Sequence, residues 1–380
     1  AIADDNAIKV GSNATLDVKG VTISNPIRLD QNSILTNSSS TASEISGAVI
    51  ITDDSTINGT GNIELSGLVN LPIGISTLGD VSLTKSGSNT LNLSGDNFEE
   101  ANTDYSSYIG ETILNAGTFS LGNVDSIGTL KSVKPKFTFS GGTLQFSSNN
   151  TTDISSIFSN SANQSYKIDT NGQSVTLASD LTSSGGTFEK KGTGTLTLSG
   201  DNTYDGDTTV SAGTLKAGSV SSGTIGTPTV GPFGTGSLIN NSTIDVDNKL
   251  IHNAKTTAGT IINKPSPTLS FTSANLSASD GDNVSNTLTH SGNGTITYSS
   301  SSNSIATVDS SSGAVTLVGN GTVTITASAT SSNEYADAST TYSLVVTGFT
   351  ASNSQPSNSQ QSQKASDNAV RNATNSIPKN

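Results

Sequence analysis

The amino-acid sequence predicts an all-β protein in which a long β-solenoid is followed by a small β-sandwich. Three observations lead to this prediction. Short runs of alternating apolar and polar residues recur along residues 1–264, one segment occurs there twice, and the pattern changes to hairpins after residue 265. Because only 31% of the residues are hydrophobic and 4% are aromatic, we expect thin cores built from small aliphatic side chains.

The repeated segment is "KKGTGTLTLSGDNTYDGDTTVSAGTLKAG", residues 190–218. Its "TLTLSGDN" from Thr195 matches "TLNLSGDN" from Thr90, an offset of 105 residues (195 − 90). Its "YDGDTTVSAGTL" from Tyr204 matches "YIGETILNAGTF" from Tyr108, an offset of 96 (204 − 108). The upstream copy therefore contains a nine-residue insertion, roughly "FEEANTDYS", and insertions of this kind are typical of loops that project from a repeated scaffold.

Within each copy the side chains alternate with a period of two. Leu196 and Leu198 point to one face, Thr195 and Thr197 point to the other, and "SGDN" then ends the strand. Such strands of about 4 to 6 residues return roughly every 20 to 25 residues, with Gly, Asn and Asp at the corners. One coil leaves its apolar face in water, whereas stacked coils bury it, so we expect about eleven or twelve stacked coils over residues 1–264.

After residue 264 the pattern predicts a second domain. Pro265 and Pro267 form a stiff connector, and "GNG" at 319–321 is a strong tight-turn signal. Roughly 85 residues with about seven short strands predict an immunoglobulin-like β-sandwich over 265–348. Residues 349–380 are rich in Ser, Asn and Gln and predict a polar tail or linker. The side chains expected on the inner face of the sandwich are Val323, Ile325, Ala327, Tyr342, Leu344 and Val346.

Composition excludes several classes of function. The chain has no cysteine, so disulfides, thiolate metal sites and a cysteine nucleophile are impossible. A net charge of −13 disfavours nucleic-acid binding and attraction to anionic lipid. No apolar run approaches the ~20 residues of a membrane span, so we expect no membrane insertion of this chain. Because the chain starts at Ala1 rather than Met, we expect a mature product or an excised fragment that is secreted or displayed on a surface.

We expect no enzymatic activity. The two histidines, His252 and His290, lie in ordinary strand and turn contexts, so a Ser-His-Asp arrangement is not indicated. Adjacent carboxylates on a strand point to opposite faces, and carboxylates two apart in a turn are usually solvated. A polysaccharide-degrading β-helix enzyme with an acidic cleft stays open as an alternative. The carboxylate pairs in question are Asp53/Asp54, Glu99/Glu100, Asp205/Asp207 and Asp245/Asp247.

Acidic turns are candidate calcium sites. Carboxylate and carbonyl oxygens can hold Ca²⁺, although none of these turns has EF-hand spacing. We expect no other cofactor. The candidate ligands are Asp205, Asp207, Asp245, Asp247, Asp280 and Asp282.

The insertion in the upstream copy is the candidate binding loop. Tyr105 lies inside it in a chain that is poor in aromatic residues, whereas Tyr108 aligns with the repeat residue Tyr204 and is expected to pack at a corner. The acidic residues Glu99, Glu100 and Asp104 lie in the same loop.

Residues 190–218 closely resemble the passenger-associated repeat of bacterial autotransporters, whose pattern is approximately K-x-G-x-G-x-L-x-L-x-G-x-N-x-Y-x-G-x-T-x-V-x-x-G-T-L. The 83–121 copy departs from it through its insertion and through Phe119 in place of Leu. Residues 268–347, with "YSSSSNSIATVDSSSGAVTLVGNGTVTITAS", resemble a bacterial immunoglobulin-like domain of surface adhesins. The resemblance implies a right-handed parallel β-helix, secreted or held on the surface of a Gram-negative bacterium.

Two functions remain open on this basis. The first is a non-enzymatic adhesive passenger that presents loops such as residues 98–107 to a host or neighbouring-cell surface. The second is a self-associating subunit of an extracellular filament or surface layer, with or without Ca²⁺, because the end of a solenoid exposes unpaired strand edges.

Overall fold

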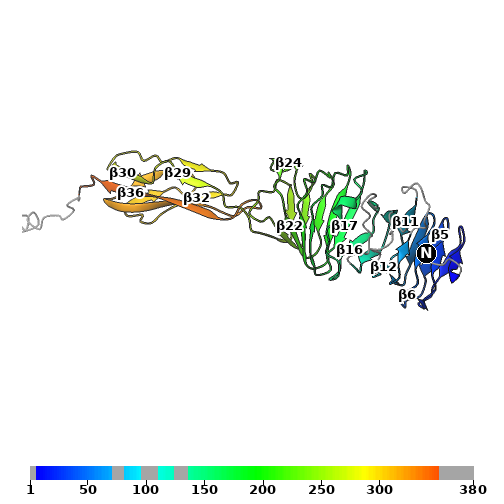
Figure 1. The fold of residues 1–380 in the computed structure, drawn as a ribbon. Helices are drawn as coiled ribbons and strands as arrows, with labels where there is room; N and C mark the ends of the chain where they lie inside the picture. The colour runs from blue at the N-terminus through cyan, green and yellow to red at the C-terminus, as the bar shows by residue number, and fades with distance from the viewer. Residues whose placement is uncertain (1–5, 71–80, 96–109, 124–135, 351–380) are drawn as a thin grey trace, which may run out of the picture. The chain divides into compact units, whose positions relative to one another are not determined.

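The computed structural model describes residues 6–70, 81–95, 110–123 and 136–350. The chain divides into two compact units, and Figure 1 shows that strands form nearly all of their regular structure. A short 3₁₀ turn occupies Ser155–Ile157. Within the described ranges, no helix has the length and apolar character needed to cross a membrane. The first unit comprises Ala1–Thr268, Ser291–Thr295 and Thr330–Ala338, and the second comprises Leu269–His290, Ile296–Ala329 and Ser339–Asn380.

The first unit is a β-solenoid in which strands of successive coils pair in parallel. Four sheets run along it, each built from one strand per coil. In sheet order, the four-stranded sheet is β1 (Ile8–Val10), β4 (Ile27–Leu29), β7 (Val49–Ile51) and β10 (Val69–Asn70). The six-stranded sheet is β15 (Lys136–Phe139), β13 (Glu111–Leu114), β11 (Ser82–Lys85), β8 (Ser55–Gly59), β5 (Ser33–Asn37) and β2 (Thr15–Asp17). The eleven-stranded sheet is β27 (Lys255–Thr257), β25 (Leu238–Asn240), β21 (Thr208–Val210), β19 (Thr187–Lys191), β17 (Ser165–Asp169), β16 (Thr143–Gln145), β14 (Thr118–Leu121), β12 (Thr90–Leu93), β9 (Ile63–Leu65), β6 (Ser43–Ile45) and β3 (Thr22–Ile23). The five-stranded sheet is β18 (Ser174–Leu177), β20 (Thr195–Leu198), β22 (Thr214–Ala217), β26 (Thr243–Asp245) and β28 (Thr260–Ile262).

The coils vary in length more than the sequence predicted. Thr208 pairs with Leu238 in the next coil, a separation of 30 residues (238 − 208), whereas Leu238 pairs with Lys255 after 17 (255 − 238). The long coil contains an antiparallel hairpin of β23 (Ser222–Thr224) and β24 (Thr227–Val230). In a parallel solenoid the strands must pair with those of the next coil, but the segments that connect strands within a coil can vary in length.

The predicted inward side chains are confirmed. Leu196 pairs in register with Leu215, and both are fully buried. Leu198 and Val210 are also buried, so each coil places its aliphatic residues on those of the next. The parallel arrangement predicted for these strands is likewise present, whereas the handedness of the coil stays a prediction.

The expectation of a core made only of small aliphatic side chains was wrong for the middle of the solenoid. Aromatic rings pack there against one another, with centroids 4.8 Å apart for Phe139 and Phe158 and 6.0 Å apart for Phe188 and Tyr204. The low overall aromatic share did not reveal this because the rings are concentrated in one part of the chain. The buried rings of this stack are Phe119, Phe137, Phe139, Phe158, Tyr166, Phe188 and Tyr204.

Each repeat buries one lysine. Lys190 is fully buried, and its Nζ donates to the carbonyl oxygens of Lys191 at 2.7 Å and Gly192 at 2.6 Å within its own coil. It also donates to Ala212 O of the next coil at 3.2 Å. The ammonium group therefore joins two coils where the backbone turns its carbonyls inward.

Lys85 occupies the equivalent position in the upstream repeat. Its Nζ donates to Ser86 O at 2.7 Å, to Asn89 Oδ1 at 2.9 Å and to Ala116 O of the next coil at 3.3 Å. Burial lowers the pKa of Lys85 to about 8, and burial likewise lowers the pKa of Lys190 to about 8.

The second unit contains its own sheets and core. A four-stranded sheet has the order β30-β36-β35-β32, in which β30 and β36 are parallel and β32 and β35 are antiparallel. Two antiparallel pairs, β29–β31 and β33–β34, complete the described strands of this unit. The predicted inner-face residues, from Val323 to Val346, are all buried and so confirmed. The strands are β29 (Leu269–Phe271), β30 (Asn275–Ser279), β31 (Leu288–His290), β32 (Ile296–Ser300), β33 (Ala306–Val308), β34 (Val315–Leu317), β35 (Gly321–Ala329) and β36 (Ala338–Thr347).

Replacing Gly213 by alanine should destabilise the solenoid. Gly213 has φ +66°, and an added Cβ would lie 2.5 Å from Gly194 O and 2.9 Å from Lys190 Nζ. The backbone conformation alone costs about 1–3 kcal/mol for a non-glycine residue, and the steric contact adds to it. Urea unfolding of Gly213→Ala should therefore show a lower midpoint. Gly11→Ala is the matched control, because its Cβ would meet no atom within 4 Å. Equal midpoints for the two variants would contradict this prediction.

The buried lysines should make the solenoid more stable as the pH rises from 8 to 10.5. In that interval the folded lysines, with a pKa of about 8, lose protons that the unfolded chain, with a lysine pKa of 10.5, still holds. The unfolded state then binds more protons, so the free energy of unfolding increases with pH. Urea unfolding between pH 7 and pH 10 should give a steeper increase for the wild type than for Lys85→Met/Lys190→Met. Lys136→Met, at a half-exposed lysine, should keep the wild-type slope. Parallel slopes for the wild type and the double variant would refute the prediction.

Candidate functional site

The predicted binding loop lies outside the described residues. This applies to Glu99, Glu100, Asp104 and Tyr105, and also to Tyr108. The role of this loop stays a prediction from sequence. Tyr204, which is the counterpart of Tyr108 in the downstream repeat, is fully buried in the aromatic stack.

The acidic pair of the downstream repeat contacts backbone amides. The Asp205 carboxylate accepts a hydrogen bond from Gly185 N–H, and Asp207 accepts one from Ser237 N–H at 3.2 Å. Asp54, of the pair Asp53/Asp54, likewise accepts Ser82 N–H at 2.8 Å. Each of these carboxylates accepts a backbone N–H of a neighbouring coil. Their geometry therefore supports a structural role in holding adjacent coils together.

Asp245 and Asp247 lie among lysines. Lys216 Nζ is 3.1 Å from Asp247 Oδ1 and 3.8 Å from Asp245 Oδ2, and Lys249 Nζ is 2.5 Å from Asp247 Oδ2. Hydrogen bonds from Lys249 and then from Lys216 hold the pKa of Asp247 below its ordinary value. A cation binding here would compete with two ammonium groups.

Asp280 and Asp282 belong to a turn of the second unit, where Asp282 Oδ2 accepts Ser279 N–H at 2.7 Å. Among the residues with described positions, no group of three or more His, Cys, Asp or Glu side chains could hold a metal ion. Calcium binding at the six predicted aspartates therefore stays a prediction.

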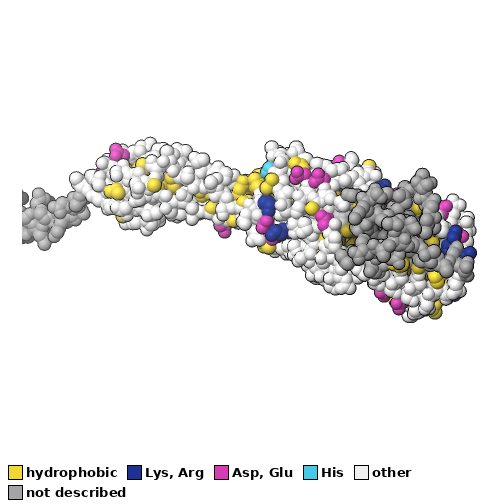
Figure 2. Space-filling model, viewed as in Figure 1, with side chains coloured by type: hydrophobic (Ala, Val, Ile, Leu, Met, Phe, Trp, Pro, Cys, Tyr) yellow, Lys and Arg dark blue, Asp and Glu magenta, His cyan; other side chains and the backbone are white. Residues whose placement is uncertain are grey.

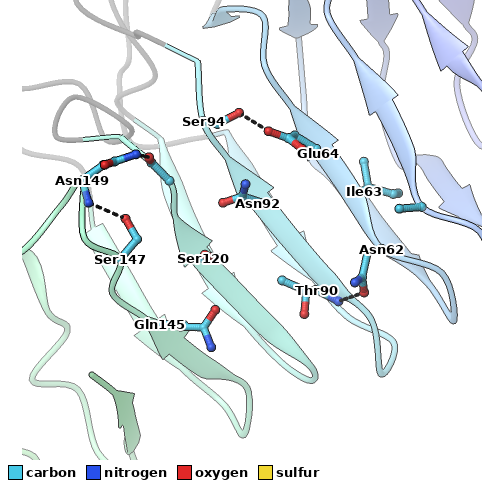
Figure 3. A pocket seen from close by; sticks show the side chains of 12 residues that line it. Asn62, Ile63, Glu64, Thr90, Asn92, Ser94, Ser120, Gln145, Ser147 and Asn149 are labelled. Carbon is cyan, nitrogen blue, oxygen red and sulfur yellow. Dashed lines mark hydrogen bonds between the residues drawn. The ribbon is translucent and has the colours of Figure 1, made fainter. Parts of the chain in front are cut away.

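A groove on the eleven-stranded sheet is the candidate functional site that the structure adds. It has a volume of about 510 Å³ and crosses consecutive coils, from Ala42 just before β6, past β9, β12 and β14, to β16 and the residues that follow it (Figure 3). Among the residues that the structure describes, its lining contains one charged side chain, Glu64, and neither lysine, arginine nor an aromatic ring. The lining residues are Ala42, Asn62, Ile63, Glu64, Thr90, Asn92, Ser94, Ser120, Gly122, Gln145, Ser147 and Asn149.

Backbone register sets the floor of this groove. Asn92 pairs with Glu64 on one side and with Ser120 on the other, and Ser120 pairs with Gln145. One outward side chain per coil therefore forms a row along the sheet. The short side chain of Ser120 and the absence of one at Gly122 leave room at the centre of the row.

The borders of the groove are held by hydrogen bonds, whereas its centre is not. Ser94 Oγ donates to Glu64 Oε1 at 2.6 Å, and Gln145 Nε2 donates to Asp169 Oδ2 at 2.9 Å. The side chains of Asn92 and Ser120 make no hydrogen bond to another described residue, although Ser120 is only 7% exposed. Such a site can exchange hydrogen bonds with a neutral polar ligand.

Sequence reasoning missed this groove because its residues occupy ordinary outward positions of strands. A usable signal was present in the aligned segments "IELS" (63–66), "LNLS" (91–94), "FSLG" (119–122) and "LQFS" (144–147). Each places one polar residue between two buried apolar residues and follows them with Ser or Gly.

Comparison with known proteins agrees with the repeat pattern. The family described as "Passenger-associated-transport-repeat" matches residues 83–121 and 188–217. Two segments of this chain thus match the autotransporter passenger repeat. The family described as "Intimin, immunoglobulin-like domain" matches residues 280–331 of the second unit. Both resemblances inferred from the sequence are thus confirmed.

A curated relative shares part of the chain. "Adhesin BmaC autotransporter" of Brucella suis biovar 1 (strain 1330) is 32% identical over 164 residues. The match covers 41% of this chain and 4% of that adhesin, so the chain corresponds to a small part of its length. No solved structure matches the chain. The passenger repeats and this homology confirm the predicted location, secreted from or on the surface of a Gram-negative bacterium.

Proposed function

We propose that this chain is a non-enzymatic adhesive passenger segment that binds a host or neighbouring-cell surface. The observation that supports this most is the row of outward polar side chains along consecutive coils, in a chain homologous to an autotransporter adhesin. On the face drawn in Figure 2, uncharged polar groups predominate and charged side chains occur in small groups. A stack of coils repeats such a surface at intervals of about 4.8 Å, which is suited to contact rather than to catalysis.

The proposal includes the insertion at residues 98–107 as a second contact segment. This part rests on sequence, because the insertion interrupts a repeat whose other copy lacks it. Insertions on a repeated scaffold are where binding residues are commonly found.

Removing the insertion should weaken cell adhesion without unfolding the chain. Beads coated with the purified chain should bind cultured epithelial cells, and deletion of residues 98–106 should lower the bound fraction several-fold. Ile225→Ser is the control, because Ile225 is 46% exposed at the turn of the β23–β24 hairpin. Thermal unfolding followed by circular dichroism should give the same midpoint for all three proteins. Wild-type beads that fail to adhere to any cell type would argue against the adhesive function.

A self-assembling subunit is the second candidate, favoured by one observation. β1, β2 and β3 each end a sheet, and Val21 beside β3 is 53% exposed. A strand that ends a sheet offers its unpaired backbone groups to another chain.

Sedimentation velocity at increasing protein concentration, in Ca²⁺ and in EDTA, separates the two candidates. The adhesive proposal predicts one monomeric species in all samples. Concentration-dependent filaments would favour the subunit, and filaments that require Ca²⁺ would also support the predicted aspartate sites.

A further inference from the structure

We infer that the groove on the eleven-stranded sheet is a binding site for a neutral glycan, an extended chain of uncharged, hydroxyl-bearing sugar units. This inference rests on the proposed adhesive function and names the ligand class for one of its surfaces. It is independent of the insertion at 98–107.

The chemistry of the lining selects a neutral ligand. Asn92, Gln145 and Asn149 each present an amide that both donates and accepts hydrogen bonds, and the serine and threonine hydroxyls do the same. Sugar hydroxyls have this dual character. The described lining residues include no lysine or arginine that would neutralise a sulfate, phosphate or carboxylate, and the Glu64 carboxylate repels such groups.

The centre of the groove has polar groups that are free to bond to a ligand. Ser120 is 7% exposed, its hydroxyl lines the groove, and it makes no hydrogen bond to another described residue. The Ser120 hydroxyl is not one of the buried polar atoms without a partner in the described part of the chain, so it faces the open groove, where a ligand hydroxyl can take the place of solvent. The amide of Asn92, which pairs with Ser120 across the strands, also makes no hydrogen bond to another described residue, so both groups can bond to ligand hydroxyls.

The regular spacing of the side chains along the groove favours an extended, repeating ligand. Glu64, Asn92, Ser120 and Gln145 stand one per coil in register, which spaces them by about 4.8 Å along the sheet. Their neighbours at the border are already fixed, because Glu64 holds Ser94 and Gln145 contacts Asp169. Repeated groups at regular intervals on the protein match a ligand that repeats its own groups.

The same geometry disfavours a peptide. The strands under the groove, β9, β12, β14 and β16, are interior strands whose backbone groups already pair with coils on both sides. A peptide strand therefore has no sheet edge to join. Within the described lining, Ile63 is the one large apolar residue, and because it is fully buried it offers no contact to an apolar anchor of a peptide.

Direct binding of the whole chain to defined oligosaccharides tests the inference. The probes are immobilised linear hexasaccharides of glucose, galactose and N-acetylglucosamine, with sulfated and sialylated oligosaccharides of equal length as anionic comparators. We expect binding to at least one neutral probe and to none of the anionic ones. Asn92→Arg, which adds bulk and charge at the centre, and Ser120→Gln, which fills the space, should each weaken that binding at least tenfold.

Thr84→Arg is the matched control. Thr84 lies on β11 of the same coil as Asn92, is partly exposed, and faces outward from the six-stranded sheet. This variant should keep the wild-type affinity, and equal unfolding midpoints for the three variants should show that the solenoid is intact.

The outcomes separate this inference from the adhesive function. Beads that adhere to cells while the chain binds no neutral probe would overturn the glycan site and leave adhesion standing. Binding that survives both groove substitutions, or binding to the anionic probes alone, would overturn it as well. Neutral-glycan binding that is lost in Asn92→Arg would support the site even if the beads fail to adhere, and only the adhesive function would then be rejected.

Discussion

Parallel backbone pairing between successive coils is the constraint on which the rest of this solenoid depends. It fixes which residue of one coil stands beside which residue of the next, as Leu196 stands beside Leu215 and Asn92 beside Ser120. Inside, the result is continuous burial of aliphatic and aromatic side chains. Outside, the same pairing aligns polar side chains into rows, so the core and the groove arise from one hydrogen-bonding pattern.

The pairing also explains the residues that the repeats share. Paired coils lie so close together that there is no room for a side chain at Gly213, where the backbone passes near Gly194 O. The backbone turns carbonyls inward at the same corner, and the buried ammonium of Lys190 satisfies them. The lysine and the glycines of the repeat are thus parts of one corner that joins two coils.

Much of the fold could be predicted from sequence, because alternation with a period of two identifies inward residues such as Leu198 and Val323 without knowledge of their partners. The aromatic stack was missed because it requires knowing that Phe139 and Tyr166 lie in neighbouring coils, 5.3 Å apart. The groove was missed for the same reason, since Ser120 becomes distinctive only between Asn92 and Gln145. The link from Asp207 to the next coil could not be predicted either, because the sequence does not show that its carboxylate faces the amide of Ser237.

The parallel pair β30–β36 in the second unit has a mechanical consequence. Five residue pairs join these strands, from Asn275 with Ser343 to Ser279 with Thr347. Because the strands point the same way, tension that enters at Asn275 and leaves at Thr347 pulls them along each other in opposite directions. All five pairs must then slip together, whereas a pull at one end of a hairpin opens its bonds one by one. The proposed adhesive role would load the chain in this way, and the parallel pairing of β30 and β36 makes shear the direction in which they resist separation.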